Sequence, residues 1–160
     1  MDKTNTPSTP GIIHLQGEGK DITVGQMVIS LKVSGRETDG AWTLLEYRVP
    51  PRVSDLPLHW HAQISESFYV LSGTLTVQIE ARTIQALPGS FVMVTPRLLH
   101  RFSNEAGVTA TFLSWVAPSG LEDFLSELSA LARTAPWPPP ETPQLAALKA
   151  RYDIHPLPND

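Results

Sequence analysis

The chain has 160 residues, which at about 150 residues per domain corresponds to one domain, and its 41% of apolar residues suffices for a packed core. Lysine and arginine number 12 against 16 acidic residues, and the net charge of −4 disfavours nucleic acid or an anionic membrane as the main partner, because phosphates would be repelled. The chain has no cysteine, so disulfides, thiol catalysis and thiolate metal ligands are excluded.

Prolines and polar residues divide the chain into three parts. Residues 1–11 are polar and contain prolines, which predicts a flexible tail, and they lack the apolar stretch of a signal peptide. Residues 12–133 form the expected domain, and residues 134–160 the expected proline-rich connector, short helix and tail. No apolar run reaches the about 18 residues of a membrane span, so we expect a cytoplasmic protein without a membrane partner.

Apolar and polar side chains alternate through most of the domain, which is the period of a β-strand. In the first such run Met27 and Ile29 share one face, whereas Ser30 points to the other. The same pattern, bounded by turn residues, predicts strands over residues 27–33, 41–49, 66–71, 75–79, 91–94, 99–102 and 108–116. Short strands without helices between them predict an all-β antiparallel sandwich or barrel.

Helical periodicity begins only after the last predicted strand. One apolar stripe, spaced as on a helix, consists of Leu121, Phe124, Leu125, Leu128 and Leu131. Ser119 and Glu122 have the spacing of a capping box at the start of this helix. A second short helix is predicted with Thr142 as its N-cap and Pro143 in its first position. We expect these helices to cover the barrel or to contact another subunit.

Four residues with metal-binding side chains form the candidate functional cluster. His59 and His61 are two residues apart, so in a strand both imidazoles point to one side while Trp60 points to the other. Glu66 follows five residues later, and His100 enters a later strand. Three imidazoles and a carboxylate without sulfur suit one divalent transition metal, which could be Fe, Mn, Ni, Zn or Cu.

The spacing of these residues resembles the first motif of the cupin superfamily. His59, His61, Glu66 and Gly73 are separated by gaps of one, four and six residues, as in that motif. The resemblance implies a double-stranded β-helix, that is, a cupin or jelly-roll barrel, followed here by one or two C-terminal helices. The flanking strand and helix are similar to those of small single-domain cupins of the quercetin dioxygenase type.

The second cupin motif is matched in spacing by Gly89, Thr95, Arg97, His100 and Asn104. The proline of the motif is displaced by one position to Pro96, and Arg97 stands where the motif has glycine. We therefore expect the turn before His100 to differ from the usual one. The metal-binding positions of both motifs are intact.

The resemblance implies that His59, His61, Glu66 and His100 hold the metal and that Glu66 can also take up a proton. It points to a metal-dependent, dioxygenase-like oxidoreductase, and the aromatic and aliphatic side chains expected around the site favour a small apolar or aromatic molecule as its substrate. The alternatives are a noncatalytic cupin that binds or senses a small molecule, and an isomerase or decarboxylase on the same scaffold. A redox-active metal that turns over O₂ favours the oxygenase, whereas zinc or no metal favours the binding protein.

Several side chains are candidate contacts to the substrate. They are Tyr47, Phe68, Phe91, Met93, Arg97, Phe102 and Phe112. Phe68 shares a strand face with Glu66, and Phe102 shares one with His100. The other aromatic and methionine candidates, with Trp115, could instead belong to the core. Arg97 either pairs with a substrate carboxylate or lies in solvent.

Other residues are expected to have structural roles. His14 and His155 lie outside both motifs and are expected to be exposed to solvent. Asn104 is expected to close a turn, and Gly73 and Gly89 to adopt positive φ. Single-domain cupins are usually dimers, and an exposed edge strand at residues 27–33 would need a cover or a partner, so we expect a homodimer.

Overall fold

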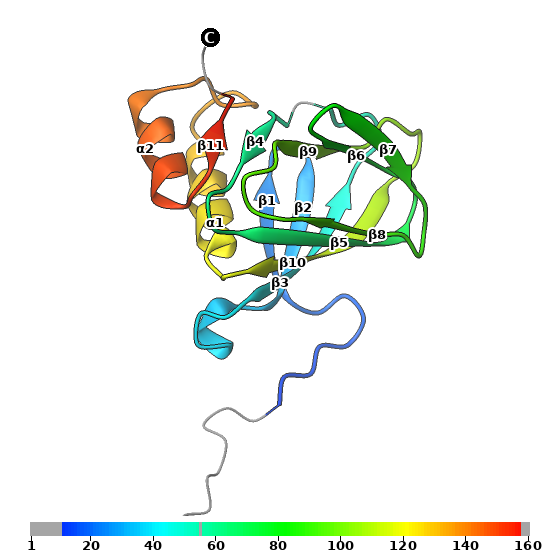
Figure 1. Ribbon diagram of the computed structural model, residues 1–160. Coiled ribbons are helices and arrows are strands. Elements are labelled where there is room, and N and C mark those ends of the chain that lie inside the picture. The colour runs from blue at the N-terminus through cyan, green and yellow to red at the C-terminus, as the bar shows by residue number, and fades with distance from the viewer. Residues whose placement is uncertain (1–10, 55, 158–160) are drawn as a thin grey trace, which may run out of the picture.

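The computed structural model describes residues 11–54 and 56–157, and it contains two antiparallel sheets that face each other (Figure 1). Among these residues the larger sheet has the order β1 (Lys20–Val24), β2 (Met27–Val33), β3 (Thr43–Val49), β10 (Ala110–Ala117), β5 (Ser65–Ser72) and β8 (Phe91–Val94). The smaller sheet has the order β11 (His155–Pro156), β4 (His59–Trp60), β9 (His100–Ser103), β6 (Leu75–Ile79) and β7 (Arg82–Ala86). The predicted all-β jelly-roll barrel is confirmed. Of the tail expected over residues 1–11, all but the last residue lies outside the described residues.

The core lies between the two sheets, because alternate side chains of each strand point inward. Phe68 and Val70 of β5 are buried on the same face as Glu66, as the alternation predicted. Tyr47 of β3 stacks on Phe112 of β10, with ring centroids 4.9 Å apart. Burial of such aromatic surface at about 25 cal/mol per Å² is the main source of stability in a barrel of this size.

The strand over residues 27–33 is not an edge, contrary to our expectation. β1 pairs with its residues 27–31, with Ile22 opposite Ile29. Polar side chains on the outer face also connect β1 and β2 to β3. Arg48 Nη2 of β3 lies 3.1 Å from Asp21 Oδ1 of β1 and 2.8 Å from Ser30 Oγ of β2. β1 was not predicted because its alternation covers only two buried side chains, those of Ile22 and Val24.

Two α-helices close one end of the barrel: α1 (Leu121–Ala132) and α2 (Pro143–Arg151). The predicted cap of α2 is confirmed, since Thr142 Oγ1 accepts a hydrogen bond from the backbone N–H of Leu145 at 3.2 Å. The predicted capping box of α1 is wrong, because Gly120 is the N-cap and Ser119 makes no capping bond. The buried carboxylate of Glu122 instead accepts from Gly120 N and from Gly35 N, each at 2.8 Å. It thus ties α1 to the short helix η1 (Gly35–Glu37).

The turns follow the predictions for glycine and asparagine. Gly73 has a φ of 72° and Gly89 a φ of 87°. Asn104 is fully buried, and its Nδ2 donates to three backbone carbonyls, among them that of Val108 at 2.8 Å. Within the described ranges, neither α-helix has the length and apolar character needed to cross a membrane.

Candidate metal centre and its cavity

The four predicted ligands converge inside the barrel. His59 lies on β4 directly opposite His100 of β9, Glu66 reaches in from β5, and His61 follows the end of β4. One donor atom from each of the four side chains lies within 4.8 Å of all the others, which is the space around a single ion. His61, Glu66 and His100 are buried, and His59 is half-buried. The pairing of the short strand β4 with β9 therefore places the candidate ligands of the two motifs next to each other.

Backbone carbonyls determine the orientation and the tautomer of each imidazole. Each Nδ1 faces one carbonyl oxygen: His59 faces Pro57 at 3.1 Å, His61 faces Asp153 at 2.7 Å and His100 faces Leu98 at 2.9 Å. A carbonyl can only accept, so each Nδ1 carries the hydrogen and the neutral ring presents a lone pair at Nε2. The buried Nε2 atoms of His61 and His100 have no hydrogen-bond partner among the described residues. Lone pairs directed at a common point are the arrangement that a metal ion requires.

Glu66 supplies negative charge to this cluster. Its Oε1 lies 3.3 Å from His61 Nε2 and its Oε2 lies 3.6 Å from His100 Nε2, which is within ion-pair distance but without hydrogen-bond geometry. Burial alone would raise the pKa of Glu66, but hydrogen bonds and positive charge from His61 and His100, when these carry a proton on Nε2, outweigh it and hold that pKa well below its usual range. In the same way burial would lower the pKa of His61, but Glu66 outweighs it and raises that pKa. The cluster thus favours a cation at its centre, and its donors fit a transition metal.

His59 is the most accessible of the three imidazoles from the cavity side. Its burial, together with the neighbouring His100, lowers its pKa to about 4. At neutral pH the ring is therefore uncharged, which is the form that ligates a metal.

Asp153, near the end of the chain, holds the loop between two of the ligands. Besides its contact to His61, its carboxylate accepts from the backbone N–H of Ala62 at 2.8 Å, of Gln63 at 2.8 Å and of Ile64 at 3.4 Å. Burial would raise the pKa of Asp153, but these N–H groups outweigh it and lower that pKa. Sequence analysis missed this residue, because its partners are about 90 positions away and no local spacing connects them.

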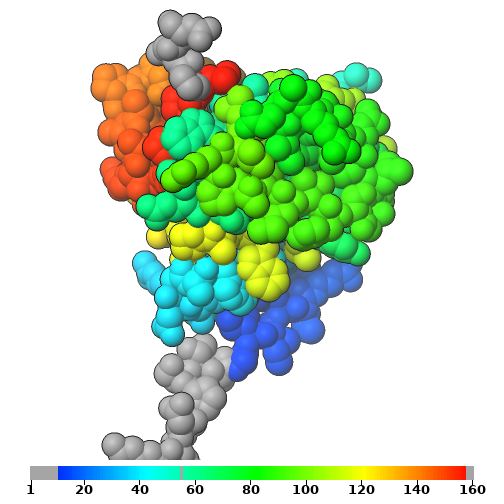
Figure 2. Space-filling view, in the orientation of Figure 1, coloured from blue at the N-terminus to red at the C-terminus, as the bar shows by residue number. Residues whose placement is uncertain are grey.

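The C-terminal segment is therefore part of the wall of the site. β11 pairs with β4, and His155 stacks on Trp60 with ring centroids 4.3 Å apart. The expectation that His155 is exposed is wrong: it is half-buried, and its Nε2 lies 2.8 Å from Asp153 Oδ1. His14 is exposed, as expected. Figure 2 shows this segment, in orange to red, against the side of the barrel.

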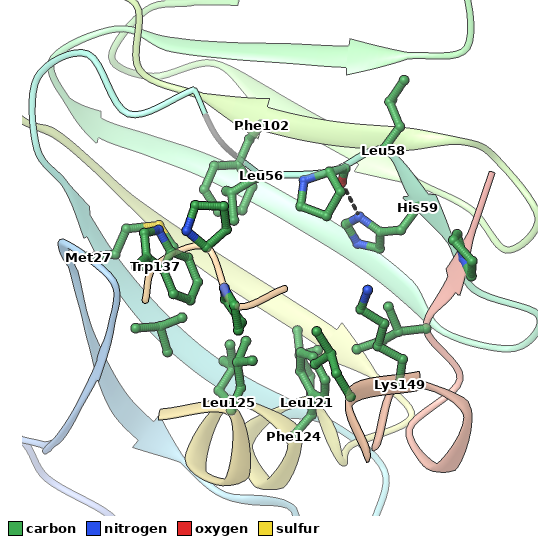
Figure 3. A pocket seen from close by; sticks show the side chains of 18 of the residues that line it. Met27, Leu56, Leu58, His59, Phe102, Leu121, Phe124, Leu125, Trp137 and Lys149 are labelled. Carbon is green, nitrogen blue, oxygen red and sulfur yellow. Dashed lines mark hydrogen bonds between the residues drawn. The ribbon is translucent and has the colours of Figure 1, made fainter. Parts of the chain in front are cut away.

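A cavity of about 170 Å³ extends from the metal-ligand cluster toward the helices (Figure 3). It is bordered by His59 and Glu66 at one end. Its other walls are mainly apolar and include Met27, Leu56, Phe102, Leu121, Phe124 and Trp137. These residues come from β2, the loop before β4, β9, α1 and the proline-rich connector, so the cavity is built from segments on both sides of the cupin motifs.

Four of the predicted substrate contacts lie in or behind this cavity. Tyr47 and Phe102 line it, with ring centroids 5.5 Å apart. Burial, and to a smaller extent the Glu66 carboxylate, raise the pKa of Tyr47 well above its usual value, so it is a neutral phenol at neutral pH. Phe68 and Phe112 are almost completely buried in the core and pack against Phe102.

The other three predicted contacts lie away from the cavity. Phe91 and Met93 are 64% and 52% exposed on the outer face of β8, and Trp115 is likewise exposed, so none of them belongs to the core. Arg97 is exposed and has a φ of 71°, a conformation that glycine adopts more easily. Its backbone N–H donates to the carbonyl of His61 at 2.7 Å. Arg97 therefore adopts a positive φ at the position of the motif glycine, and its backbone N–H fixes the carbonyl of a proposed metal ligand.

Comparisons with known proteins agree with this geometry. Residues 45–116 match the family of the cupin domain. A curated relative, quercetin 2,3-dioxygenase of Bacillus subtilis, is 26% identical over 114 residues, which cover 70% of this chain but only 33% of that enzyme. The chain thus matches about one third of the length of this relative.

Solved structures show the same fold at low sequence identity. KdgF from a Halomonas species has a TM-score of 0.59 and 13% identity, covering 68% of this chain and 96% of that one. A predicted oxalate decarboxylase from Thermotoga maritima has a TM-score of 0.55 and 17% identity, covering 62% of this chain and 90% of that one. With the jelly-roll barrel and the cluster of His59, His61, Glu66 and His100, these matches show that the chain has the cupin fold and that residues 45–116 are similar to the cupin domain.

Proposed function

We propose that this cupin is a metal-dependent oxygenase of the dioxygenase type, acting on a small apolar or aromatic molecule. The observation that carries the proposal is the set of Nε2 lone pairs that faces the carboxylate of Glu66 at the end of an apolar cavity. A bound redox-active metal would supply Lewis acidity and the capacity to react with O₂. An ion held by these four protein ligands would still have positions open for a substrate and O₂.

The protein residues have separate tasks in this proposal. His59, His61 and His100 hold the ion as neutral ligands, because their Nδ1–H groups are already bound to carbonyls. Glu66 takes up the proton that a hydroxyl or enol of the substrate loses on binding. Both atoms of O₂ then enter the organic product, so O₂ oxidises the substrate and no external reductant is needed. The apolar walls exclude water from the reacting groups.

The relative supports the reaction class and leaves the substrate open. The match covers only one third of the length of that quercetin 2,3-dioxygenase. The match therefore supports the type of reaction and does not identify the substrate.

Metal analysis combined with O₂ consumption tests the proposal. The protein is purified without a chelating tag, its metals are measured by elemental analysis, and the ion is located by anomalous scattering. We expect about one iron, manganese, nickel or copper ion per chain and O₂ uptake with a turned-over aromatic substrate. Zinc alone, or no metal, would instead make the chain a noncatalytic small-molecule-binding cupin.

We also propose that the chain forms a homodimer through the outer face of the larger sheet. Leu113, Tyr69 and Phe91 lie side by side across β10, β5 and β8, and Tyr69 and Phe91 are 44% and 64% exposed. Exposed apolar rows on a sheet are typical of subunit contacts. A sedimentation mass near twice 17.6 kDa is expected at micromolar concentration, and the Phe91→Asp variant should be monomeric. A monomeric parent protein would exclude this assembly.

A further inference from the structure

Besides the carboxylate of Glu66 and the imidazole of His59, the cavity is lined by one cationic side chain, that of Lys149. Among the residues that line it, Glu66 and Lys149 are the charged ones. Glu66 is directed into the histidine cluster, so its charge is already compensated there. Lys149, from α2, pairs with Glu141 outside the cavity lining and also borders the cavity, where a ligand would be a second acceptor for its ammonium group. We infer that Lys149 binds an anionic group of the ligand and that the cavity takes a single-ring aromatic carboxylate.

The position of Lys149 suits this task. Its side chain is only 17% exposed, and Figure 3 shows it reaching from α2 toward His59. The described residues provide its Nζ with one ion-pair partner, Glu141, which is itself 60% exposed. An ammonium group has three N–H donors, and a mostly buried one gains most from a further acceptor. A carboxylate in the cavity would supply that acceptor, and the cavity would supply an apolar surface for the rest of the molecule.

The volume of the cavity indicates the size of the group that it can hold. A dry apolar cavity of about 150 Å³ in another protein holds one benzene molecule. The cavity here measures about 170 Å³, which is enough for one ring with a short side chain. The inference thus deepens the proposed function, on which it rests for the reaction, by naming its substrate class as single-ring arylalkanoates that carry a hydroxyl or enol group. Phenylacetate is their simplest analogue for binding measurements.

Arg97, which the sequence suggested as the partner of a substrate carboxylate, does not compete for this role. It is exposed and is not among the residues that line the cavity. Lys149 lies outside both cupin motifs and outside the family match at residues 45–116. Recognition of the anion therefore comes from the C-terminal segment, whereas the metal ligands come from the barrel.

Calorimetric titration at pH 7 with phenylacetate and with its neutral analogue phenylacetamide tests the inference. We expect the parent protein to bind the acid about 10- to 100-fold more tightly than the amide, since a hydrogen bond to a charged group discriminates by this amount. Lys149→Met should abolish this preference and leave the affinity for the amide unchanged, and Lys149→Arg should retain most of it. Lys32→Met is the matched control, because Lys32 is 13% exposed, lies 3.6 Å from Glu46 and does not line the cavity.

The same titrations with chelator-treated protein separate this inference from the proposed function. A preference for the acid that survives metal removal and disappears in Lys149→Met supports the inference. A preference that disappears with the metal and persists in Lys149→Met places the carboxylate on the metal and overturns it. Equal binding of acid and amide by the parent protein, or binding of neither, also overturns it, whether or not the variants fold. Metal content measured on the same samples decides the proposed function independently.

Discussion

The carbonyl oxygen of Asp153 lies 2.7 Å from Nδ1 of His61, although 92 positions separate the two residues. A residue near the end of the chain thus determines which nitrogen of a proposed metal ligand carries the hydrogen. The carboxylate of Asp153 also binds the backbone of residues 62–64, which connect His61 to the strand of Glu66. Both contacts act on the geometry of the cluster and not on the ion itself.

Replacement of Asp153 should weaken both the fold and the metal site. We expect Asp153→Ala to lower the free energy of unfolding by about 2–3 kcal/mol, because several backbone N–H groups lose a charged acceptor. Metal affinity should fall about 10- to 100-fold, which is the usual effect of removing support from a ligand. Asp39→Ala is the matched control: Asp39 also has a positive φ, of 51°, but no side-chain partner among the described residues. Equal effects of the two substitutions would show that only backbone strain matters.

Substitution of the cluster residues should separate metal binding from proton transfer. His59→Ala and His100→Ala should lose most of the bound metal, because imidazoles form most of the donor set and no cysteine can replace them. Glu66→Gln should retain part of the metal but slow a proton-transfer step about 10²–10⁴-fold. Elemental analysis and activity are compared with those of His14→Ala, which is exposed. Equal metal content in all variants would exclude a metal site at this cluster.

Two glycines with similar backbone angles should differ in their tolerance of alanine. At Gly73 a Cβ would lie 2.4 Å from the backbone oxygen of Thr109, whereas at Gly89 nothing lies within 4 Å. Gly89→Ala should therefore cost only the about 1–2 kcal/mol of a left-handed residue. Gly73→Ala should cost about 3 kcal/mol or more, because backbone must move. Urea denaturation of both variants measures the difference, and similar midpoints would contradict this explanation.

Asp21 should stabilise the outer face of the larger sheet in a pH-dependent way. The hydroxyl of Ser30 and the guanidinium of Arg48 lower the pKa of Asp21 below its usual value. A carboxyl whose pKa is lower in the folded state contributes stability above its unfolded pKa of about 3.9, and this contribution is lost as the pH falls through the folded value.

The effect is small, because Asp21 is 53% exposed and its charge is screened by solvent. Asp21→Asn should therefore lower the urea midpoint slightly at pH 7 and less at pH 3. Asp39→Asn is the control, since Asp39 has no ion pair among the described residues. A difference between parent and Asp21→Asn that stays constant with pH would count against this assignment.

Much of the barrel could be predicted because the alternation of side chains is local. Strands Met27–Val33, Leu75–Ile79 and Phe91–Val94 have the predicted bounds. Alternation does not tell which of two faces points inward, however. In β8 the valines Val92 and Val94 are buried and the larger Phe91 points outward, although its volume suggested the core. The strand β7 escaped prediction because four of its five residues are at least partly exposed.

The metal-ligand cluster could be predicted for the same local reason, and its surroundings could not. His59 and His61 share a side because they are two residues apart, and motif spacing connected them to Glu66 and His100. The contact of Asp153 to His61 and the approach of Lys149 to the cavity depend on how the C-terminal segment folds back. Such tertiary contacts leave no periodic signal in the sequence.

The pairing of β11 with β4 also sets the order of events during biosynthesis. At about 5–20 residues per second, Asp153 leaves the ribosome's catalytic centre about 5–18 s after His61. Through that interval the nascent barrel can form its β-ladders, but His61 has no carbonyl to hold its ring. The cluster is therefore completed only once the chain has been synthesised as far as Asp153, 92 residues after His61.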